Sequence, residues 1–338
     1  MPQDARPRNR RRAPVRRSRG PRVLPIAAVL AVCALGGAWW LWAGPGPATK
    51  ELSVVVPEGA TLSRAAGQLE KAGAIHSRQL FLGFAKLLGN GGSIRAGEYR
   101  IAPGTSARQI LEMLQQGKTQ QRLVTVPEGM PSILVAEALA KAPGLSGEAK
   151  APAEGSVLPD TYAYVRDEPR AAVLVRMQKA MTDYLAKAWA GRDKGLVVTT
   201  PREAIILASI VEKETAKPAE RTTVAAVYAN RLKAGMPLQA DPTIIYPITK
   251  GKPLGRRILQ SELHAKNGYN TYTMRGLPEG PIANPGRASI DAVLHPADSK
   301  ALYFVADGTG GHVFAETYQQ HQANVAKWYA IRRAKGEM

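Results

Sequence analysis

Residues 200–215 read TPREAIILASIVEKET, and this stretch predicts a buried helix around which the rest of the chain is organised. Thr200 can cap the helix, Pro201 suits its first position, and Glu203 completes a Thr-x-x-Glu capping box. The body is apolar on nearly every side, which is typical of a helix that lies inside a core. Two glutamates, Glu212 and Glu214, nevertheless follow within the same pattern.

These two glutamates are the first candidates for chemistry. At about 100° per residue, Glu214 falls on the apolar stripe of the helix, whereas Glu212 lies at its edge. A carboxylate among apolar side chains is costly unless it is paired or protonated, and desolvation raises its pKa toward the value that suits a general acid. The alternative is that both glutamates are solvated at a fraying helix end, with Lys217 as a surface partner.

The first 43 residues carry the charge pattern of a membrane anchor. Residues 1–22 hold nine arginines against one acid, Asp4, and are too polar to fold alone. Residues 23–43 are an uncharged, largely apolar run with three tryptophans at its far end, which is long enough to span a bilayer. Arginines before the run and none directly after it predict a cytoplasmic N-terminus, with residues 44–338 outside the inner membrane.

Two alternatives exist for this N-terminal segment. A cleaved signal peptide would have a shorter apolar core, and Gly-Pro-Gly-Pro at 44–47 offers no small-residue cleavage site. The arginines could also bind nucleic acid, but beside a span we interpret them as a topology signal that faces anionic lipid. We therefore expect the cytoplasmic membrane, and no nucleic acid, as the partner of this segment.

Charge and cysteine content narrow the function of the exported part. Subtracting the tail's +8 from the chain's +19 leaves about +11 for residues 44–338, which suits an acidic polymer or a membrane surface. The only cysteine, Cys33, lies in the apolar run, so a disulfide or a thiol nucleophile is excluded from the exported part. The five histidines show no ligand-like spacing, so we expect no metal site and no cofactor.

Strand–turn–helix units recur in the first half of the exported part. Residues 52–69 and 124–139 each read as a strand, a Pro-Glu-Gly turn and a helix, and residues 99–114 form a weaker copy. The pattern resembles the LysM-type βααβ modules that bind glycan chains, and the alternative is packing units without a ligand. A Pro/Ala-rich boundary at 149–153 predicts LysM-like modules over 44–150 and a larger domain over 151–338.

The larger domain is predicted to be α+β, with the buried helix at its centre. Residues 238–286 are rich in loops, amides and aromatic rings, which is typical of a groove that holds sugars. The other expected elements are a long amphipathic helix at 170–190, a helix from Pro218 to Gly235, a strand hairpin at 301–314 and a terminal helix at about 318–333.

Seven short strings occur in an order that strongly resembles the YceG-like family. The likeness covers roughly residues 50–330. It departs from the family at 266–268 and at Glu279, where the family usually has prolines; these differences would affect the shape of loops and not the catalytic acid. The strings are LASIVEKET at 207–215, NRL at 230–232, LQ-x-DPT at 238–243, YNTY at 269–272, GLP at 276–278, NPG at 284–286 and YFVA-x-G at 303–308.

The resemblance implies a membrane-anchored endolytic murein transglycosylase, a carbon–oxygen lyase that acts on a polysaccharide. Such an enzyme cuts nascent peptidoglycan strands between N-acetylmuramic acid and N-acetylglucosamine, leaves 1,6-anhydro ends and works with peptidoglycan synthases. The family's essential glutamate lies in the Glu-Lys-Glu string; we place it at Glu214, in agreement with the stripe, with Glu212 as the fallback. The alternative from another class is a non-catalytic, membrane-tethered peptidoglycan-binding scaffold.

Five further residues are predicted to contact the substrate or to position the acid. Asp241 would be the second carboxylate if the reaction were a hydrolysis. The alternative is turn chemistry, because Asp-Pro and Asn-Pro are ordinary turn starters. The five residues are Gln239, Asp241, Asn270, Tyr272 and Asn284.

Overall fold

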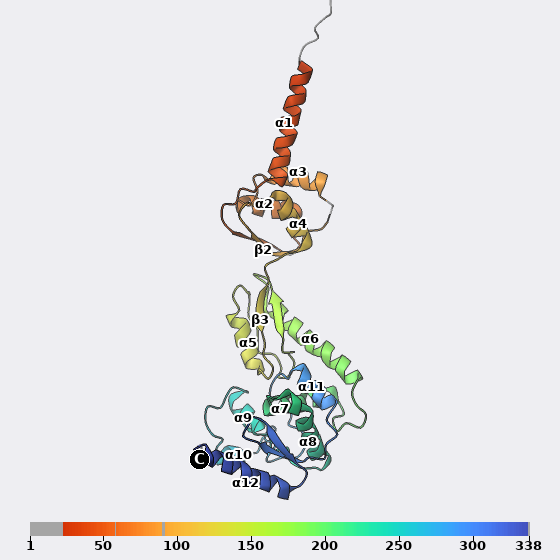
Figure 1. The fold of residues 1–338 in the computed structure, drawn as a ribbon, viewed down its shortest axis with the longest axis vertical. Coiled ribbons are helices and arrows are strands. Elements are labelled where there is room, and N and C mark those ends of the chain that lie inside the picture. Colours follow the sequence, from red (N-terminus) through yellow and green to blue (C-terminus); the bar gives the residue numbers. More distant parts are fainter. Residues whose placement is uncertain (1–22, 58, 90–91, 337–338) are drawn as a thin grey trace, which may run out of the picture. The chain divides into compact units, whose positions relative to one another are not determined.

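The computed structural model describes residues 23–57, 59–89 and 92–336, with side chains from residue 28 onward. The described residues form an α+β fold in which helices predominate and three two-stranded antiparallel sheets are present, which confirms the predicted fold class (Figure 1). The chain divides into two compact units, residues 1–120 and 121–338. The arginine-rich tail at 1–22 lies outside the described residues.

The N-terminal unit contains a β-α-α-β module followed by a further helix, and its likeness to LysM modules stays a prediction. Strand β1 pairs with β2 so that Val54 lies opposite Tyr99, and the helices cover a core that includes Leu69, Phe81 and Leu114. A glycan ligand for this module stays a prediction. The elements are β1 (Leu52–Val56), α2 (Leu62–Lys71), α3 (Arg78–Leu88), β2 (Gly97–Ile101) and α4 (Ala107–Gln116).

Helix α1 (Val23–Ala43) occupies the residues predicted to form the apolar run. Its end packs on the module, because Trp42 is buried and its ring lies 5.3 Å from that of Phe84 and 6.1 Å from that of Phe81, centroid to centroid. Among the residues whose side chains the structure describes, which in α1 begin at residue 28, no helix combines the length and the apolar character that crossing a membrane requires.

The C-terminal unit begins with the second predicted strand–turn–helix copy. Strand β3 (Arg122–Thr125) pairs antiparallel with β4 (Thr161–Tyr164), and α5 (Ser132–Lys141) and α6 (Arg170–Ala190) pack against this ribbon. Because β3 finds its partner beyond residue 150, the chain divides after Gln120 rather than at the predicted boundary.

Helix α7 (Pro201–Glu214) is the centre of the C-terminal unit, as the sequence predicts. Every residue from Ala204 to Val211 is buried, and the helix packs against α6, α8 (Arg221–Lys233), α9 (Asp241–Thr249) and α11 (Arg287–Leu294). The Thr200 hydroxyl accepts the Glu203 backbone amide proton at 3.2 Å, which confirms the predicted cap, but the Glu203 carboxylate accepts from the Thr199 amide rather than from that of Thr200, so the predicted capping box does not form.

Two helices, α9 and α10 (Gln260–Leu263), lie in the region at 238–286 that the sequence predicts as rich in loops, and α11 directly follows it, where no element was predicted. The helix predicted from Pro218 begins as a 3₁₀ turn (Pro218–Glu220) and continues as α8, and Gly235 follows it with a positive φ of 64°. The predicted hairpin forms from β5 (Tyr303–Ala306) and β6 (His312–Ala315), and α12 (Tyr318–Ala334) packs beside it (Figure 1).

Candidate active site

Glu214 is the last residue of α7 and lies where that buried helix meets α8. The residue is only partly exposed, and its carboxyl oxygen Oε1 is shut off from solvent with no hydrogen-bond partner among the described residues. Buried polar atoms are nearly always paired, so an exception is a candidate for a reacting group.

The pKa of Glu214 is raised to about 7. Burial is the main cause, because a charged carboxylate loses its hydration; the Tyr228 hydroxyl opposes this effect, the charge of Asp241 adds to it and the charge of Arg231 opposes it. A carboxyl group with this pKa is half protonated near neutral pH, so it can both give a proton and take one.

Helix α8 supplies two neighbours of Glu214. Tyr228 is fully buried, and its ring meets that of Phe304 edge to face at 6.0 Å. The Arg231 guanidinium donates from Nε to the Leu302 carbonyl at 2.7 Å and from Nη1 to the Leu238 carbonyl at 2.6 Å, so backbone acceptors fix its position. Sequence analysis assigned neither residue a role, although an arginine within the apolar stripe of a helix was a usable signal.

Asp241 and Tyr272 form the other side of this cluster. Asp241 is the first residue of α9 and is exposed, and its Oδ1 accepts a hydrogen bond from the Tyr272 hydroxyl at 2.6 Å. Burial, this hydrogen bond and the charges of Asp241 and Glu214 raise the pKa of Tyr272. The structure thus brings Glu214, Asp241 and Tyr272 into one electrostatic cluster, and substrate contact by the last two stays a prediction.

Gln239 precedes this cluster in an exposed loop. Its φ is +53°, in the left-handed region that costs a non-glycine residue about 1 kcal/mol. Its backbone N–H donates to the Thr271 carbonyl at 3.1 Å. The strained backbone fixes the loop beside the 269–272 turn, and the side chain stays available for the predicted contact.

Asn270 and Asn284 lie in a different setting, because both are fully buried. The side-chain Nδ2 of Asn270 donates to three backbone carbonyls at 2.8–3.2 Å, those of Glu262, Leu263 and Ala265. Its Oδ1 accepts from the backbone N–H of Tyr272 at 3.0 Å. Direct substrate contact by Asn270 does not fit this position. Its hydrogen bonds instead hold the turn that presents Tyr272.

The same correction applies to Asn284. Its Oδ1 accepts from the Val157 amide at 3.0 Å, and its Nδ2 donates to the Met130 carbonyl at 2.9 Å and to the Ser132 hydroxyl at 3.1 Å. The side chain therefore joins three segments of the C-terminal unit and has no free group for a substrate.

Glu212 has surroundings unlike those of Glu214. Its side chain is 6% exposed; Oε2 accepts from the Gly286 amide at 2.9 Å, and Oε1 lies 3.7 Å from Nη2 of the buried Arg221. The same Nη2 lies 3.9 Å from Oε2 of Glu128, in the turn after β3. Glu212 is therefore a paired charge that joins α7 to two loops.

The alternative of two solvated glutamates at a fraying helix end is wrong, because each has a largely enclosed carboxyl group. Lys217 does not pair with either of them: its Nζ donates to the Thr309 hydroxyl at 3.4 Å. Glu128 and Arg221 had no predicted role, and they meet Glu212 only through the tertiary fold.

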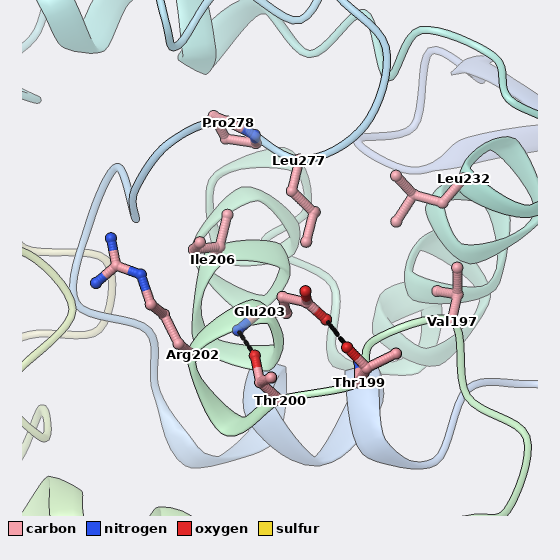
Figure 2. A pocket seen from close by; sticks show the side chains of 9 residues that line it. All are labelled: Val197, Thr199, Thr200, Arg202, Glu203, Ile206, Leu232, Leu277 and Pro278. Carbon is pink, nitrogen blue, oxygen red and sulfur yellow. Dashed lines mark hydrogen bonds between the residues drawn. The ribbon is translucent and has the colours of Figure 1, made fainter.

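A hollow of about 550 Å³ lies at the opposite end of α7 (Figure 2). Figure 2 shows the Glu203 carboxylate turned toward Thr199, whose amide and hydroxyl donate to it at 2.6 and 2.9 Å. These hydrogen bonds, led by that of the Thr199 amide, lower the pKa of Glu203. Because Glu214 lies eleven residue steps after Glu203 in the helix, about 16 Å along the axis, this hollow is separate from the candidate site.

No group of three or more His, Cys, Asp or Glu side chains in the described part of the chain could hold a metal ion. The chemistry that this arrangement supports is proton transfer by one carboxyl group of raised pKa, beside a fixed cation and a hydrogen-bonded Asp–Tyr pair.

Known proteins with similar sequences or structures were then compared with this chain. It is 29% identical to an endolytic murein transglycosylase of Bacillus subtilis (strain 168), over 84% of this chain and 86% of that protein. It is also 29% identical to an endolytic murein transglycosylase of Streptococcus pneumoniae (strain D39), over 82% of this chain but only 58% of the relative's length.

A solved structure and a family profile complete the comparison. The 2.6 Å crystal structure of a YceG-like protein from Listeria monocytogenes is 26% identical and has a TM-score of 0.49, covering 81% of this chain and 98% of that one. The profile of the YceG-like family matches residues 54–327, which is most of the sequence. The chain therefore belongs to the YceG-like family.

Proposed function

We propose that this protein is an endolytic lytic transglycosylase of peptidoglycan. The observation that carries the proposal is the enclosed carboxyl group of Glu214, whose raised pKa suits an acid that must later act as a base. Membership of the YceG-like family and the names of the two relatives support the substrate class.

The proposed reaction needs one carboxyl group in two successive roles. Protonated Glu214 donates its proton to the glycosidic oxygen between N-acetylmuramic acid and N-acetylglucosamine, and the bond from that oxygen to C1 of the muramoyl residue breaks. The Glu214 carboxylate then removes the proton from the muramoyl 6-hydroxyl, and O6 bonds to C1. The product is a 1,6-anhydro ring, no water is consumed, and Glu214 is protonated again.

The neighbours of Glu214 suit the two halves of this cycle. Burial favours the protonated carboxyl group that the first step needs. Arg231, fixed by two backbone carbonyls, stabilises the carboxylate that exists between the steps. Gln239, Asp241 and Tyr272 are the side chains that we propose for contacts with the sugars, because they are exposed or half-buried.

Localisation follows from the same proposal. We propose that the apolar run at α1 anchors the chain in the inner membrane, with the N-terminus in the cytoplasm and the active site outside, next to the peptidoglycan synthases that would supply nascent strands. The charge asymmetry of the first 43 residues supports this orientation. Extraction of membranes with alkaline carbonate should leave the full chain in the pellet, and release into the supernatant would contradict the anchor.

The product mass tests the reaction itself. Purified peptidoglycan is incubated with the detergent-solubilised full chain, and the released fragments are measured by intact mass spectrometry. The proposal predicts ends that are one water lighter than hydrolysed ends. Hydrolysed ends would instead assign a second carboxylate, with Asp241 as the candidate, and the absence of any cleavage would favour a glycan-binding scaffold.

A further inference from the structure

An apolar groove of about 490 Å³ lies in the C-terminal unit beside the candidate active site. Its walls come from the turn after β3, from α5, from α9 and from the turn at 250–254, and they consist largely of proline and aliphatic side chains. Met130, Leu134, Ile245 and Leu254 are among them. None of the residues assigned above to the reaction lines this groove.

The groove meets the candidate site at two points of the chain. Lys213 lines the groove and Glu214 is the next residue; Pro242 lines the groove and Asp241 is the residue before it. Consecutive Cα atoms are about 3.8 Å apart, so the backbones of Glu214 and Asp241 adjoin the edge of the groove, although the side chains of Lys213 and Glu214 project about 100° apart on α7. A ligand that reaches Glu214 with a branch of its own can therefore extend that branch into the groove.

The far wall of the groove is built with local backbone strain. Lys250 and Gly251 both have positive φ, 56° and 85°, and a Cβ at position 251 would lie 2.7 Å from Pro131 Cβ. Lys252 Nζ pairs with Glu137 Oε1 at 2.7 Å and ties the same turn to α5. These contacts fix the turn against α5, so this wall of the groove has a defined shape.

The charges at the rim suit a ligand that is partly anionic. Lys213 is exposed and makes no hydrogen bond or ion pair with any of the described residues. Lys252 stands at the other side of the groove but is paired with Glu137. The groove thus offers apolar walls for small aliphatic groups, and its charged groups are the paired Lys252, the half-exposed Glu128, which lies 3.9 Å from Nη2 of Arg221, and the unengaged ammonium group of Lys213, which can meet a carboxylate.

We propose that this groove is a subsite for the stem peptide that peptidoglycan carries on its muramoyl residues. The inference rests on the proposed function, in which the muramoyl residue reacts at C1 beside Glu214. The peptide is attached through a lactyl ether at C3 of that same sugar, so it leaves the ring close to the reacting bond. It combines alanine methyl groups with several carboxylates, which matches the apolar walls and the free lysine.

The test compares two substrates that differ only in the peptide. Glycan strands with uncrosslinked stem peptides and the same strands stripped by an amidase are each cleaved by the solubilised full chain, and kcat/KM is measured for both. The expected ratio of peptide-bearing to stripped strands is at least about tenfold for the unaltered protein, the size that one well-fitted apolar and ionic subsite gives.

Two groove variants should lower that ratio, and two matched variants should not. Leu134→Trp fills the groove and Lys213→Glu reverses the rim charge; each is expected to reduce the ratio by about fivefold or more. The controls are Val175→Trp on α6 and Lys233→Glu at the end of α8, which make the same changes at exposed positions outside the groove. Both controls should keep the original ratio.

The outcomes separate this subsite from the proposed reaction. Equal cleavage of both substrates by the unaltered protein, or an unchanged ratio in the surface variant Lys213→Glu, would overturn the subsite while leaving the reaction in place. Such a result is also what a groove for a polyprenyl tail or a protein partner would give. Failure to cleave either substrate would overturn the proposed function instead.

Discussion

The surroundings of Glu212 and of Glu214 differ although the two residues are only two positions apart at the end of one helix. Glu212 turns toward Arg221 and the Gly286 amide, and its charge is met on both oxygens. Glu214 turns toward α8, and one of its oxygens has no partner among the described residues.

This difference teaches how one helix can provide both an anchor and an acid. Burying a paired, hydrogen-bonded carboxylate in its charged form costs little free energy. An unpaired carboxyl group costs less free energy to bury when it is protonated. The two glutamates project about 200° apart on the helix, so they enter separate environments. Glu212 therefore suits a structural role, and Glu214 suits proton transfer.

The largest expected effect is on activity and separates the two residues by function. Glu214→Gln removes the only group that can exchange a proton in the proposed reaction, so kcat should fall by about a thousandfold or more. Release of soluble fragments from peptidoglycan, followed by chromatography, measures this loss, while circular dichroism checks the fold. Retention of more than about a tenth of the activity would move the acid to Glu212.

The second effect is on stability, where the substitution of Glu212 rather than that of Glu214 is expected to be harmful. Glu212→Gln leaves the buried Arg221 with the half-exposed Glu128, 3.9 Å away, as its one charged partner among the described residues, so the free energy of unfolding of the C-terminal unit should fall by about 3–4 kcal/mol. Urea denaturation measures the change. Glu137→Gln, which breaks the more exposed pair with Lys252, is the control and should lower the free energy of unfolding far less, because water screens an exposed ion pair. Equal losses in both variants would contradict the contrast.

The pH dependence of stability should reveal Glu214 directly. Its pKa of about 7 in the folded chain exceeds its ordinary value of 4.5, so its stabilising contribution is complete below pH 4.5 and is lost as the pH rises through 7. Relative to Glu214→Gln, the unaltered protein should therefore lose about 3 kcal/mol between pH 4.5 and pH 7.5. Unfolding midpoints of both proteins across this range would show parallel curves if the account were wrong.

The smallest expected effect concerns Tyr228. Its hydroxyl lowers the pKa of Glu214, so Tyr228→Phe should raise that pKa and shift the alkaline decline of kcat/KM upward by up to about one pH unit. Pre-steady-state or initial-rate profiles between pH 5 and 9 measure the shift. A shift toward lower pH would mean that Tyr228 does not favour the carboxylate.

The sequence was sufficient to predict α7 and its exceptional Glu214, because both follow from local pattern: a cap, an apolar run and one charge on the buried stripe. The same kind of pattern predicted α6, the C-terminal hairpin and α12. Each of these elements has a periodicity that is visible within its own residues.

Other features depend on contacts that no local pattern contains. Helix α9 lies in a region predicted as loops, and α11 was not predicted, because the prolines at 242 and 247 and the short length of α11 obscure their periodicity. The ion pairs of Arg221 join residues that are distant in the sequence, and the pairing of β3 with β4 crosses the predicted domain boundary. Asn270 and Asn284 were polar residues in loops, and only the fold reveals that they are buried.

The protonation state of Glu214 is the central claim, and carbon NMR of the side-chain carboxyl groups measures it most directly. With glutamate labelled at Cδ, one resonance should titrate with a midpoint near pH 7 and should be missing from the spectrum of Glu214→Gln. If the resonance that disappears in this variant titrates instead near pH 4.5, Glu214 is an ordinary solvated carboxylate and the proposed acid must be sought elsewhere.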